Sequence, residues 1–246
     1  MGRDAAGGAH PCVVLRDVDN TLLDNDRVTA DLRAFLQTEV GPGAAEEYFR
    51  LFEELRRELG YADYLGALQR FRLHHPHESS VLRVSSWLVD YPFAERLFPS
   101  ALEVVSRLGR LGPTVILSDG DVVFQPRKIE RSGLWAAVRG RVLVYVHKEA
   151  ELEDVERRFP ARRYVLVDDK LRVLAAVRAV WGDRLTAVFP RQGHYARDPE
   201  LLARYPEAEV ADVAVDRIAD LLELPLERLA ARPAARATGT SSLRDP

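Results

Sequence analysis

Five short apolar runs, separated by segments of helical periodicity, constrain the fold of this chain most strongly. The runs are four or five residues long and begin at Cys12, Thr114, Val142, Tyr164 and Leu185. Continuous apolar runs of this length are typical of strands that are buried on both faces of a parallel sheet. The segments between them carry apolar residues at spacings of three and four, as crossover helices do. The pattern predicts an α/β fold with a doubly wound, Rossmann-like parallel sheet.

The interval between the first two runs is much longer than the others. The first run ends near Asp17 and the second begins near Thr114, and the residues between them show Leu, Phe and Tyr at helical intervals, with a Gly-Pro-Gly break at 41–43. We predict a helical cap domain at 27–91, inserted into a core formed by 11–26 and 92–226. Because ligands of open α/β sheets bind at the carboxyl ends of the strands, the cap is expected to cover the site.

Composition excludes several classes of protein. The 35 basic and 38 acidic residues leave a net charge of -3, which offers no broad basic surface for nucleic acid or an anionic membrane. No apolar run approaches the roughly 18 residues of a membrane span, and the first residues have no secretory signal. We therefore expect a soluble cytoplasmic protein with disordered ends at 1–10 and 227–246. The single cysteine, Cys12, is expected in the core.

Lysine is rare in this chain. Of the 35 basic residues, only Lys128, Lys148 and Lys170 are lysines. Arginine carries a broad planar fork and lysine a compact point charge, so each lysine marks a candidate site where the fork would not fit. Chance placement explains any one of the three equally well.

Two acids, Asp17 and Asp19, stand at the end of the first run. Two close carboxylates repel each other, so they are buried together only when a cation lies between them or one of them holds a proton. A divalent metal ion is the natural solution. A calcium loop is excluded because Thr21 and Leu22 occupy positions where that loop requires an acid or amide and then a glycine.

Further polar residues follow the other runs. Asp168 and Asp169 follow the fourth run, Ser118 and Asp119 end the second, and Lys148 closely follows the third. In a parallel sheet all of them lie at one edge, so the four carboxylates of the two acidic pairs are expected to converge there. Acids, a hydroxyl and an ammonium together suit a phosphate dianion beside a hard metal ion.

The ordered set of these motifs resembles the haloacid dehalogenase (HAD) superfamily of phosphatases and phosphotransferases. The set is Asp17-x-Asp19-x-Thr21, Ser118, Lys148 and Asp168-Asp169, and the resemblance extends from Cys12 to about Leu224. It implies the sheet described above with an inserted helical cap of the C1 type.

The resemblance also implies a role for each residue of the first motif. Asp17 is expected to be the nucleophile that forms an aspartyl phosphate, and Asp19 the general acid and base. The phosphate is expected to bind to residues at the ends of three strands, namely Thr21, Ser118, Asp119 and Lys148.

Magnesium is the cofactor that the resemblance implies. Its expected ligands are the Asp17 carboxylate, the Asp19 backbone carbonyl and Asp168, with Asp169 as a ligand or a support. The expected function is that of a magnesium-dependent phosphatase acting on a small phosphorylated metabolite. The alternatives are a phosphotransferase such as a sugar-phosphate mutase, and a catalytically silent regulatory member of the fold. The dehalogenases that give the superfamily its name lack the second acid, so Asp19 argues against their chemistry.

Some positions depart from the family pattern or compete for a role. Arg16 stands where an apolar residue is common, Asp119 replaces a frequent asparagine, and Glu149 replaces a frequent proline. Lys128 is a rival for the phosphate-binding lysine, but it is expected within a helix after the second strand, so Lys148 is favoured. A metal site at His74, His75 and His77 is disfavoured because no further ligand completes it. Other candidate substrate contacts are Arg50, Arg56, Arg57, Arg70, Tyr61, Tyr64, Trp87 and the loop 191–195.

Overall fold

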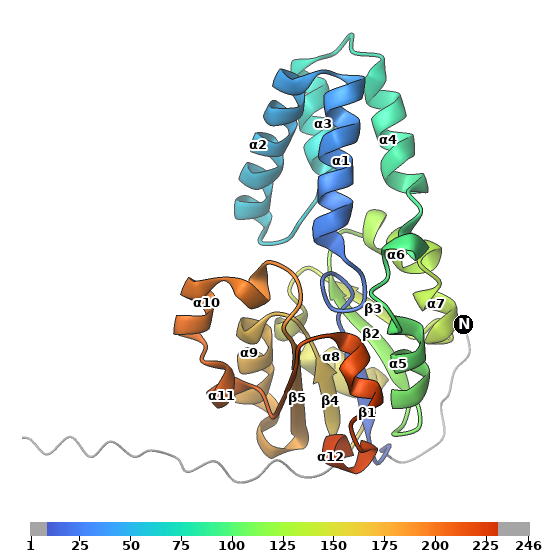
Figure 1. Cartoon of the computed structure of the whole chain (residues 1–246), viewed down its shortest axis with the longest axis vertical. Helices are drawn as coiled ribbons and strands as arrows, with labels where there is room; N and C mark the ends of the chain where they lie inside the picture. The colour runs from blue at the N-terminus through green and yellow to red at the C-terminus, as the bar shows by residue number, and fades with distance from the viewer. Residues whose placement is uncertain (1–8, 231–246) are drawn as a thin grey trace, which may run out of the picture.

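A single six-stranded parallel sheet forms the core of the protein, for which the computed structural model describes residues 9–230. The strand order is β3-β2-β1-β4-β5-β6, and Figure 1 labels the first five strands. The strands are β1 (Val13–Arg16), β2 (Thr114–Asp119), β3 (Val142–Tyr145), β4 (Tyr164–Val167), β5 (Leu185–Pro190) and β6 (Val213–Val215). The predicted fold class and the five predicted strands are confirmed. The sixth strand, only three residues long, was not predicted.

Helices cover both faces of this sheet because its strands present apolar side chains alternately to each face. In β1, Val14 packs into the core on one side of the sheet, whereas Val13 and Leu15 pack into the core on the other. The first core includes α5 and the second includes α8 and α9. The helices of this part are α5 (Ala101–Leu108), α6 (Phe124–Arg131), α7 (Leu134–Ala137), α8 (Leu152–Arg158), α9 (Leu171–Trp181), α10 (Pro199–Arg204), α11 (Glu207–Val210) and α12 (Leu226–Ala230).

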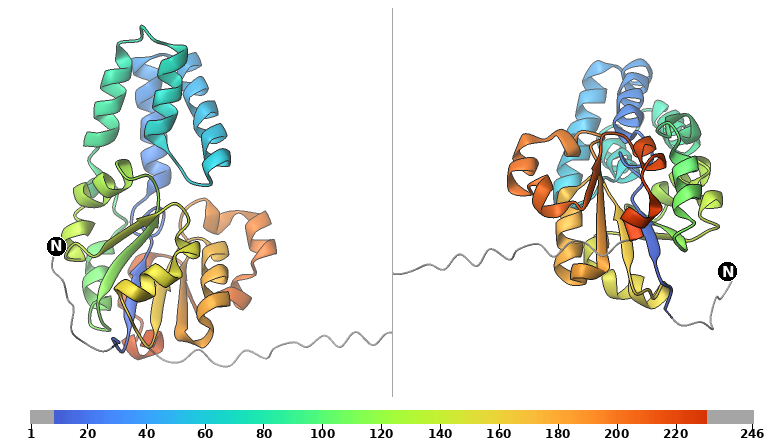
Figure 2. Two further views of the ribbon diagram at one scale, coloured as in Figure 1. Left: turned by 180° about the vertical axis from the view of Figure 1, so that it is seen from behind. Right: turned by 60° about the horizontal axis from the view of Figure 1, so that its bottom comes forward.

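The long interval after β1 folds into four helices that stand beyond one end of the sheet (Figures 1 and 2). They are α1 (Asn25–Glu39), α2 (Pro42–Leu59), α3 (Tyr64–His74) and α4 (Ser80–Asp90). The Asp24 carboxylate caps α1 by accepting a hydrogen bond from the backbone N–H of Arg27. Pro42 begins α2, where its missing N–H costs nothing. We call this four-helix unit the insert.

The strand order fixes where a ligand can bind. The chain fills one side of the sheet with β2 and β3 and then crosses to the other side with β4, so β1 and β4 are adjacent. Arg16 at the end of β1 pairs with Val167 at the end of β4. A crevice forms outside the carboxyl ends of two such strands, at the point where the strand order reverses. The insert leaves the sheet at this same edge.

Arg16, the departure noted in the sequence, is fully buried under α5. Its Nη2 donates a hydrogen bond to the backbone oxygen of Val105 over 3.2 Å. Burial lowers the pKa of Arg16 to about 9, because the charged form loses its hydration.

The predicted disordered ends need a correction inside the described residues. Residues 227–230 belong to α12, whose Leu229 is buried in the same core as α5. His10 forms a β-bridge with Ala161 instead of lying free. Apart from Ala9, the rest of both predictions falls on 1–8 and 231–246, outside the described residues.

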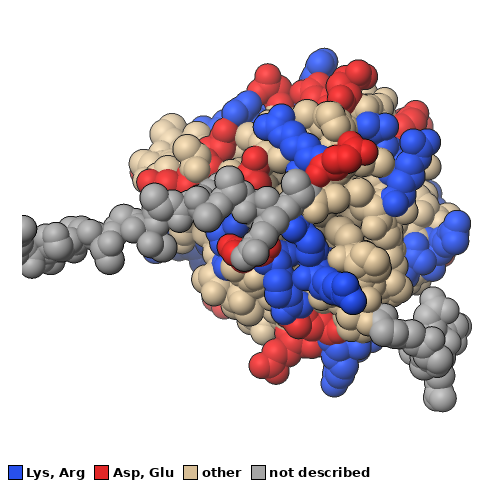
Figure 3. Space-filling view, turned by 90° about the horizontal axis from the view of Figure 1, so that it is seen from below, with Lys and Arg blue, Asp and Glu red and all other residues tan. Residues whose placement is uncertain are grey.

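Two expectations from composition can be compared with the structure. Cys12 is buried, as predicted, and burial raises the pKa of its thiol. On the face turned away from the insert, basic and acidic side chains are interspersed (Figure 3). Within 9–230, no helix combines the length and apolar character needed to cross a membrane.

Candidate active site

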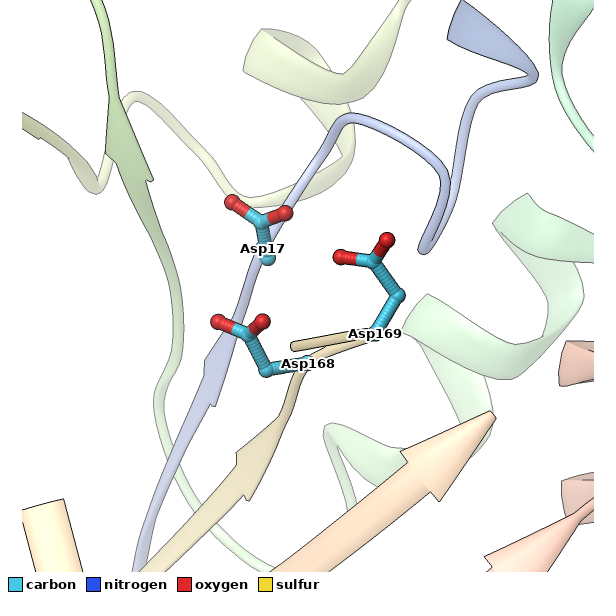
Figure 4. A group of neighbouring side chains, drawn as sticks. All are labelled: Asp17, Asp168 and Asp169. Atoms are coloured by element: carbon cyan, nitrogen blue, oxygen red, sulfur yellow. The ribbon is translucent and has the colours of Figure 1, made fainter. Parts of the chain in front are cut away.

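Three buried carboxylates meet where β1 and β4 end. Asp17, Asp168 and Asp169 each offer an oxygen within 4.8 Å of the others (Figure 4). The backbone N–H of Asp17 donates to the oxygen of Val167 over 3.0 Å, which holds the two strand ends side by side. We call these three residues the acidic cluster.

Lys148 is the cation nearest to this cluster. Its Nζ lies 2.7 Å from Asp17 Oδ1 and 2.6 Å from Asp168 Oδ2, and all three side chains are buried. Burial acts to lower the pKa of Lys148, but Asp168 and Asp17 outweigh it and raise that pKa well above its usual value. Burial acts to raise the pKa of Asp17, but Lys148 and Lys170 outweigh it and lower that pKa. Asp17 is therefore held as a carboxylate.

The acidic cluster fits a hard divalent cation. Asp17 Oδ2 and both carboxylate oxygens of Asp169 are buried without a hydrogen-bond donor. Burial raises the pKa of Asp169 well above its usual value, and burial together with Asp17 raises the pKa of Asp168 to about 6 despite Lys148. Buried oxygen ligands that lack donors are the type that magnesium takes in proteins. A cation at this position would offset the cost of burying these carboxylates and the repulsion between them.

The expected phosphate-binding residues surround Asp17. Ser118 Oγ lies 3.3 Å from Asp17 Oδ1 and accepts a hydrogen bond from Gln125 Nε2 over 2.9 Å. Thr21 Oγ1 accepts a hydrogen bond from the backbone N–H of Asp169 over 3.1 Å, so its own proton is free to point elsewhere. Asp119 Oδ1 accepts the backbone N–H of Lys148 over 2.8 Å, which makes it a support for the turn that carries Lys148.

Asp19 does not join the acidic cluster with its side chain. Its carboxylate oxygens lie 2.7 and 2.9 Å from Nζ of Lys128, which reaches it from α6. The expected convergence of four carboxylates is therefore wrong, and three converge. The fourth is drawn away because an opposite charge is available nearer to the insert. A metal contact through the Asp19 backbone carbonyl stays a prediction.

A cavity of about 710 Å³ lies between the insert and the core, next to Asp19. This volume is in the range of small-molecule sites. Of the candidate substrate contacts, Arg56, Arg57, Tyr61 and Tyr64 line the cavity from the insert. Three others are engaged elsewhere, since Arg50 bonds Glu54, Arg70 bonds Glu58 and Trp87 stacks on Phe35.

The loop after β5 also borders the cavity, through His194 and Tyr195. Gly193 makes this possible, because a Cβ there would lie 2.4 Å from the Cβ of Asn20 and its φ is +72°. His194 Nδ1 lies 2.6 Å from Asp26 Oδ1, which ties the loop to the first turn of α1.

The insert also contacts the core next to Lys148. A Cβ at Gly60, after α2, would lie 2.5 Å from Cε1 of His147, the residue before Lys148. The insert is therefore seated against the core in this structure.

The histidines at 74, 75 and 77, where a metal site was disfavoured, do not line this cavity. His74 and His75 each approach one carboxylate oxygen of Glu47, at 2.8 and 2.7 Å. Across residues 9–230, the acidic cluster is the group whose ligand atoms are close enough together to hold a metal ion.

All three lysines of the chain lie at this site. Lys148 contacts the acidic cluster, Lys128 contacts Asp19, and Nζ of Lys170 lies 4.0 Å from Asp119 Oδ2. The placement of Lys128 on Asp19, and the pairing of Gln125 with Ser118, were not predicted. The rarity of lysine was the signal that pointed to Lys128 and Lys170. Nothing in the sequence distinguished Gln125.

Comparisons with known proteins place this site in a family. Neither protein-family models nor curated protein sequences match the chain. Among solved structures, the chain is 60% identical to a protein from Burkholderia xenovorans LB400 designated a haloacid dehalogenase-like hydrolase. The match covers 88% of this chain and 99% of that chain, with a TM-score of 0.83. The chain belongs to the haloacid dehalogenase-like hydrolases.

Two more distant structures share the fold of this HAD hydrolase. A HAD hydrolase from Bacillus subtilis, described as bound to magnesium, is 14% identical with a TM-score of 0.56. The match covers 88% of this chain and 98% of the Bacillus subtilis chain. L-2-haloacid dehalogenase from Xanthobacter autotrophicus is 19% identical with a TM-score of 0.57, and the match covers 87% of this chain and 98% of that one.

Proposed function

We propose that this HAD hydrolase is a magnesium-dependent phosphatase that hydrolyses a small phosphorylated metabolite through an aspartyl phosphate on Asp17. The acidic cluster beside Lys148 is the observation that carries the proposal. A buried carboxylate, a fixed ammonium and a set of buried oxygen ligands suit attack on a phosphate dianion. The cavity volume limits the substrate to a small molecule.

Asp17 attacks phosphorus in the first step, and the bond between phosphorus and the leaving oxygen breaks. Lys148 fixes the Asp17 carboxylate through Oδ1 and adds positive charge beside the transferring group. Asp19, at the wall of the cavity, gives a proton to the leaving oxygen. In the second step Asp19 takes a proton from water, which attacks phosphorus and releases inorganic phosphate and free Asp17.

Magnesium would be held by Asp17, Asp168 and Asp169. When bound, it would neutralise the negative charge that nucleophile and substrate share. The magnesium described for the Bacillus subtilis relative supports this choice of ion. The unpartnered oxygens of Asp17 and Asp169 support it from this chain's own residues.

Asp19 favours phosphate esters over halogenated acids as substrates. A halide leaves as a stable anion and needs no proton, whereas an alkoxide leaving group needs one in the transition state. A carboxyl group at the cavity wall, separate from the nucleophile, is therefore useful for the hydrolysis of a phosphate ester and not for dehalogenation. The dehalogenase relative shares the fold, and its chemistry is the competing hypothesis.

The test is a screen of phosphate esters and 2-haloacids, with and without magnesium. Wild type is expected to release inorganic phosphate only with magnesium. Asp17→Asn is expected to lower kcat by at least about 1,000-fold while the protein stays folded, because the nucleophile is lost. Asp216→Asn removes an exposed carboxylate that bonds Arg191 and is the matched control. Halide release without phosphate release, or full activity in Asp17→Asn, would contradict the proposal.

A further inference from the structure

We propose that Lys128 is a positioning residue that holds the Asp19 carboxylate in place for proton transfer and makes this depend on the seating of the insert. The inference rests on the proposed phosphatase function and assigns a role to a lysine outside the phosphate-binding set. It is carried by a buried ion pair and by the hydrogen bonds that continue from it into the insert.

The contact between the two residues leaves the carboxylate little freedom. Lys128 Nζ reaches both Asp19 oxygens, and its third donor goes to Asn25 Oδ1 at 2.9 Å, so all three N–H groups are used. The Lys128 side chain is 1% exposed, whereas that of Asp19 is 24% exposed and faces the cavity. One side of the carboxylate is therefore held, and the other is open to substrate.

The surroundings of Lys128 suit a compact charge. Its Nζ lies 5.2 Å from the ring centre of Phe124 and 5.9 Å from that of Tyr64. Two aromatic rings and two acceptor side chains leave space for an ammonium, and the planar fork of arginine would meet the rings. This explains why a lysine stands here in a chain that otherwise uses arginine.

Hydrogen bonds connect Lys128 to two helices of the insert. Asn25 begins α1, and its Nδ2 donates to the Tyr64 hydroxyl over 3.1 Å. That hydroxyl lies 2.8 Å from Thr29 Oγ1, so α1 and α3 are joined at the same point. A movement of the insert away from the core would remove Asn25 from Lys128. The full set of bonds around Asp19 is therefore present only when the insert covers the cavity.

A role in proton donation has a signature that a purely structural role lacks. The proton matters most when the leaving group is a poor one, because a poor leaving group cannot carry the developing charge alone. Loss of Lys128 should therefore reduce the rate for alkyl phosphates far more than for activated aryl phosphates. The ratio kcat/KM isolates this step, since it reports events up to release of the leaving group.

The experiment measures kcat/KM, with magnesium present, for phosphate esters that range from an alkyl phosphate to 2,4-dinitrophenyl phosphate. Lys128→Met is expected to lose about 100-fold on the alkyl phosphate and less than about threefold on the dinitrophenyl ester. Asn25→Ala removes one bond to Nζ and is expected to show the same trend with a smaller amplitude. Arg217→Met, whose exposed guanidinium bonds Asp220 and does not line the cavity, is the control and should resemble wild type.

Each outcome decides the proposal. An equal loss on every ester would mean that Lys128 serves the fold or phosphate binding generally, which would overturn it. If Lys128→Met does not fold, Asn25→Ala decides, and a loss independent of the leaving group overturns the proposal. If wild type hydrolyses none of the esters, both this inference and the proposed function fail. If wild type is active and only the trend is absent, the proposed function survives.

Discussion

The acidic cluster of the core and the insert wall of the cavity hold their charges in opposite ways. On the core side, Asp17, Lys148 and Asp168 are buried and in direct contact. On the insert side, Arg56 and Glu53 lie 3.4 Å apart with side chains 29% and 54% exposed. Water screens the second pair, whereas the first acts in a medium of low dielectric constant. The charges of the core are therefore suited to catalysis, and those of the insert to substrate selection.

Lys148 gives the largest test of this contrast. Lys148→Met leaves Asp17 and Asp168 without their buried partner, so the free energy of unfolding of the metal-free protein should fall by about 3–5 kcal/mol. The variant should also lose about 100- to 1,000-fold in kcat/KM, because a charge aimed at the transferring group is gone. Urea unfolding and phosphate release measure the two effects. A loss of stability below about 1 kcal/mol would mean that the buried contacts of Lys148 stabilise the fold no more than an exposed ion pair does.

Arg56 tests the insert wall of the cavity. Its guanidinium lines the cavity and lies 5.3 Å from the ring centre of Tyr195, which belongs to the core. Arg56→Ala should raise KM for an anionic substrate by about fivefold with little change in kcat, since a partly exposed charge contributes about 1 kcal/mol. Arg50→Ala on the same helix, which bonds Glu54 and does not line the cavity, is the control. Equal effects of the two variants would remove Arg56 from substrate binding.

Asp154 shows what a charge outside the site contributes. It accepts hydrogen bonds from Tyr145 and Arg158, at 2.5 and 2.6 Å, and these lower its pKa from 3.8 to about 2. Because the folded-state pKa is depressed, the stabilisation is present above the ordinary pKa of the carboxyl and is lost as pH falls toward 2.

The matching variant is Asp154→Asn. It should be less stable than wild type by about 1 kcal/mol at pH 7, and the difference should shrink at pH 3. Urea unfolding at the two pH values measures it. A difference that grows as pH falls would contradict the sign, and a difference as large as that of Lys148→Met would remove the contrast between buried and exposed pairs.

The sequence predicted the sheet better than it predicted the site. Runs such as 164–167 are apolar throughout because both faces of their strands are covered. Strand β6 was not predicted because three residues at a sheet edge are too few to show an apolar run. The ion pair between Asp19 and Lys128 was not predicted because the two residues are 109 positions apart in the sequence.

Local order along the chain determined which residues stand at the ends of the strands, since parallel strands carry their carboxyl ends to one edge whatever their exact packing. That was enough to bring Asp17, Asp168 and Lys148 together. Only the tertiary structure decided how those charges pair, which of them face the cavity, and that the insert contacts the core through Asn25 and Gly60. The physical reason is that ion pairs depend on distances of a few ångströms between segments far apart in the chain, and these are set by packing, not by spacing.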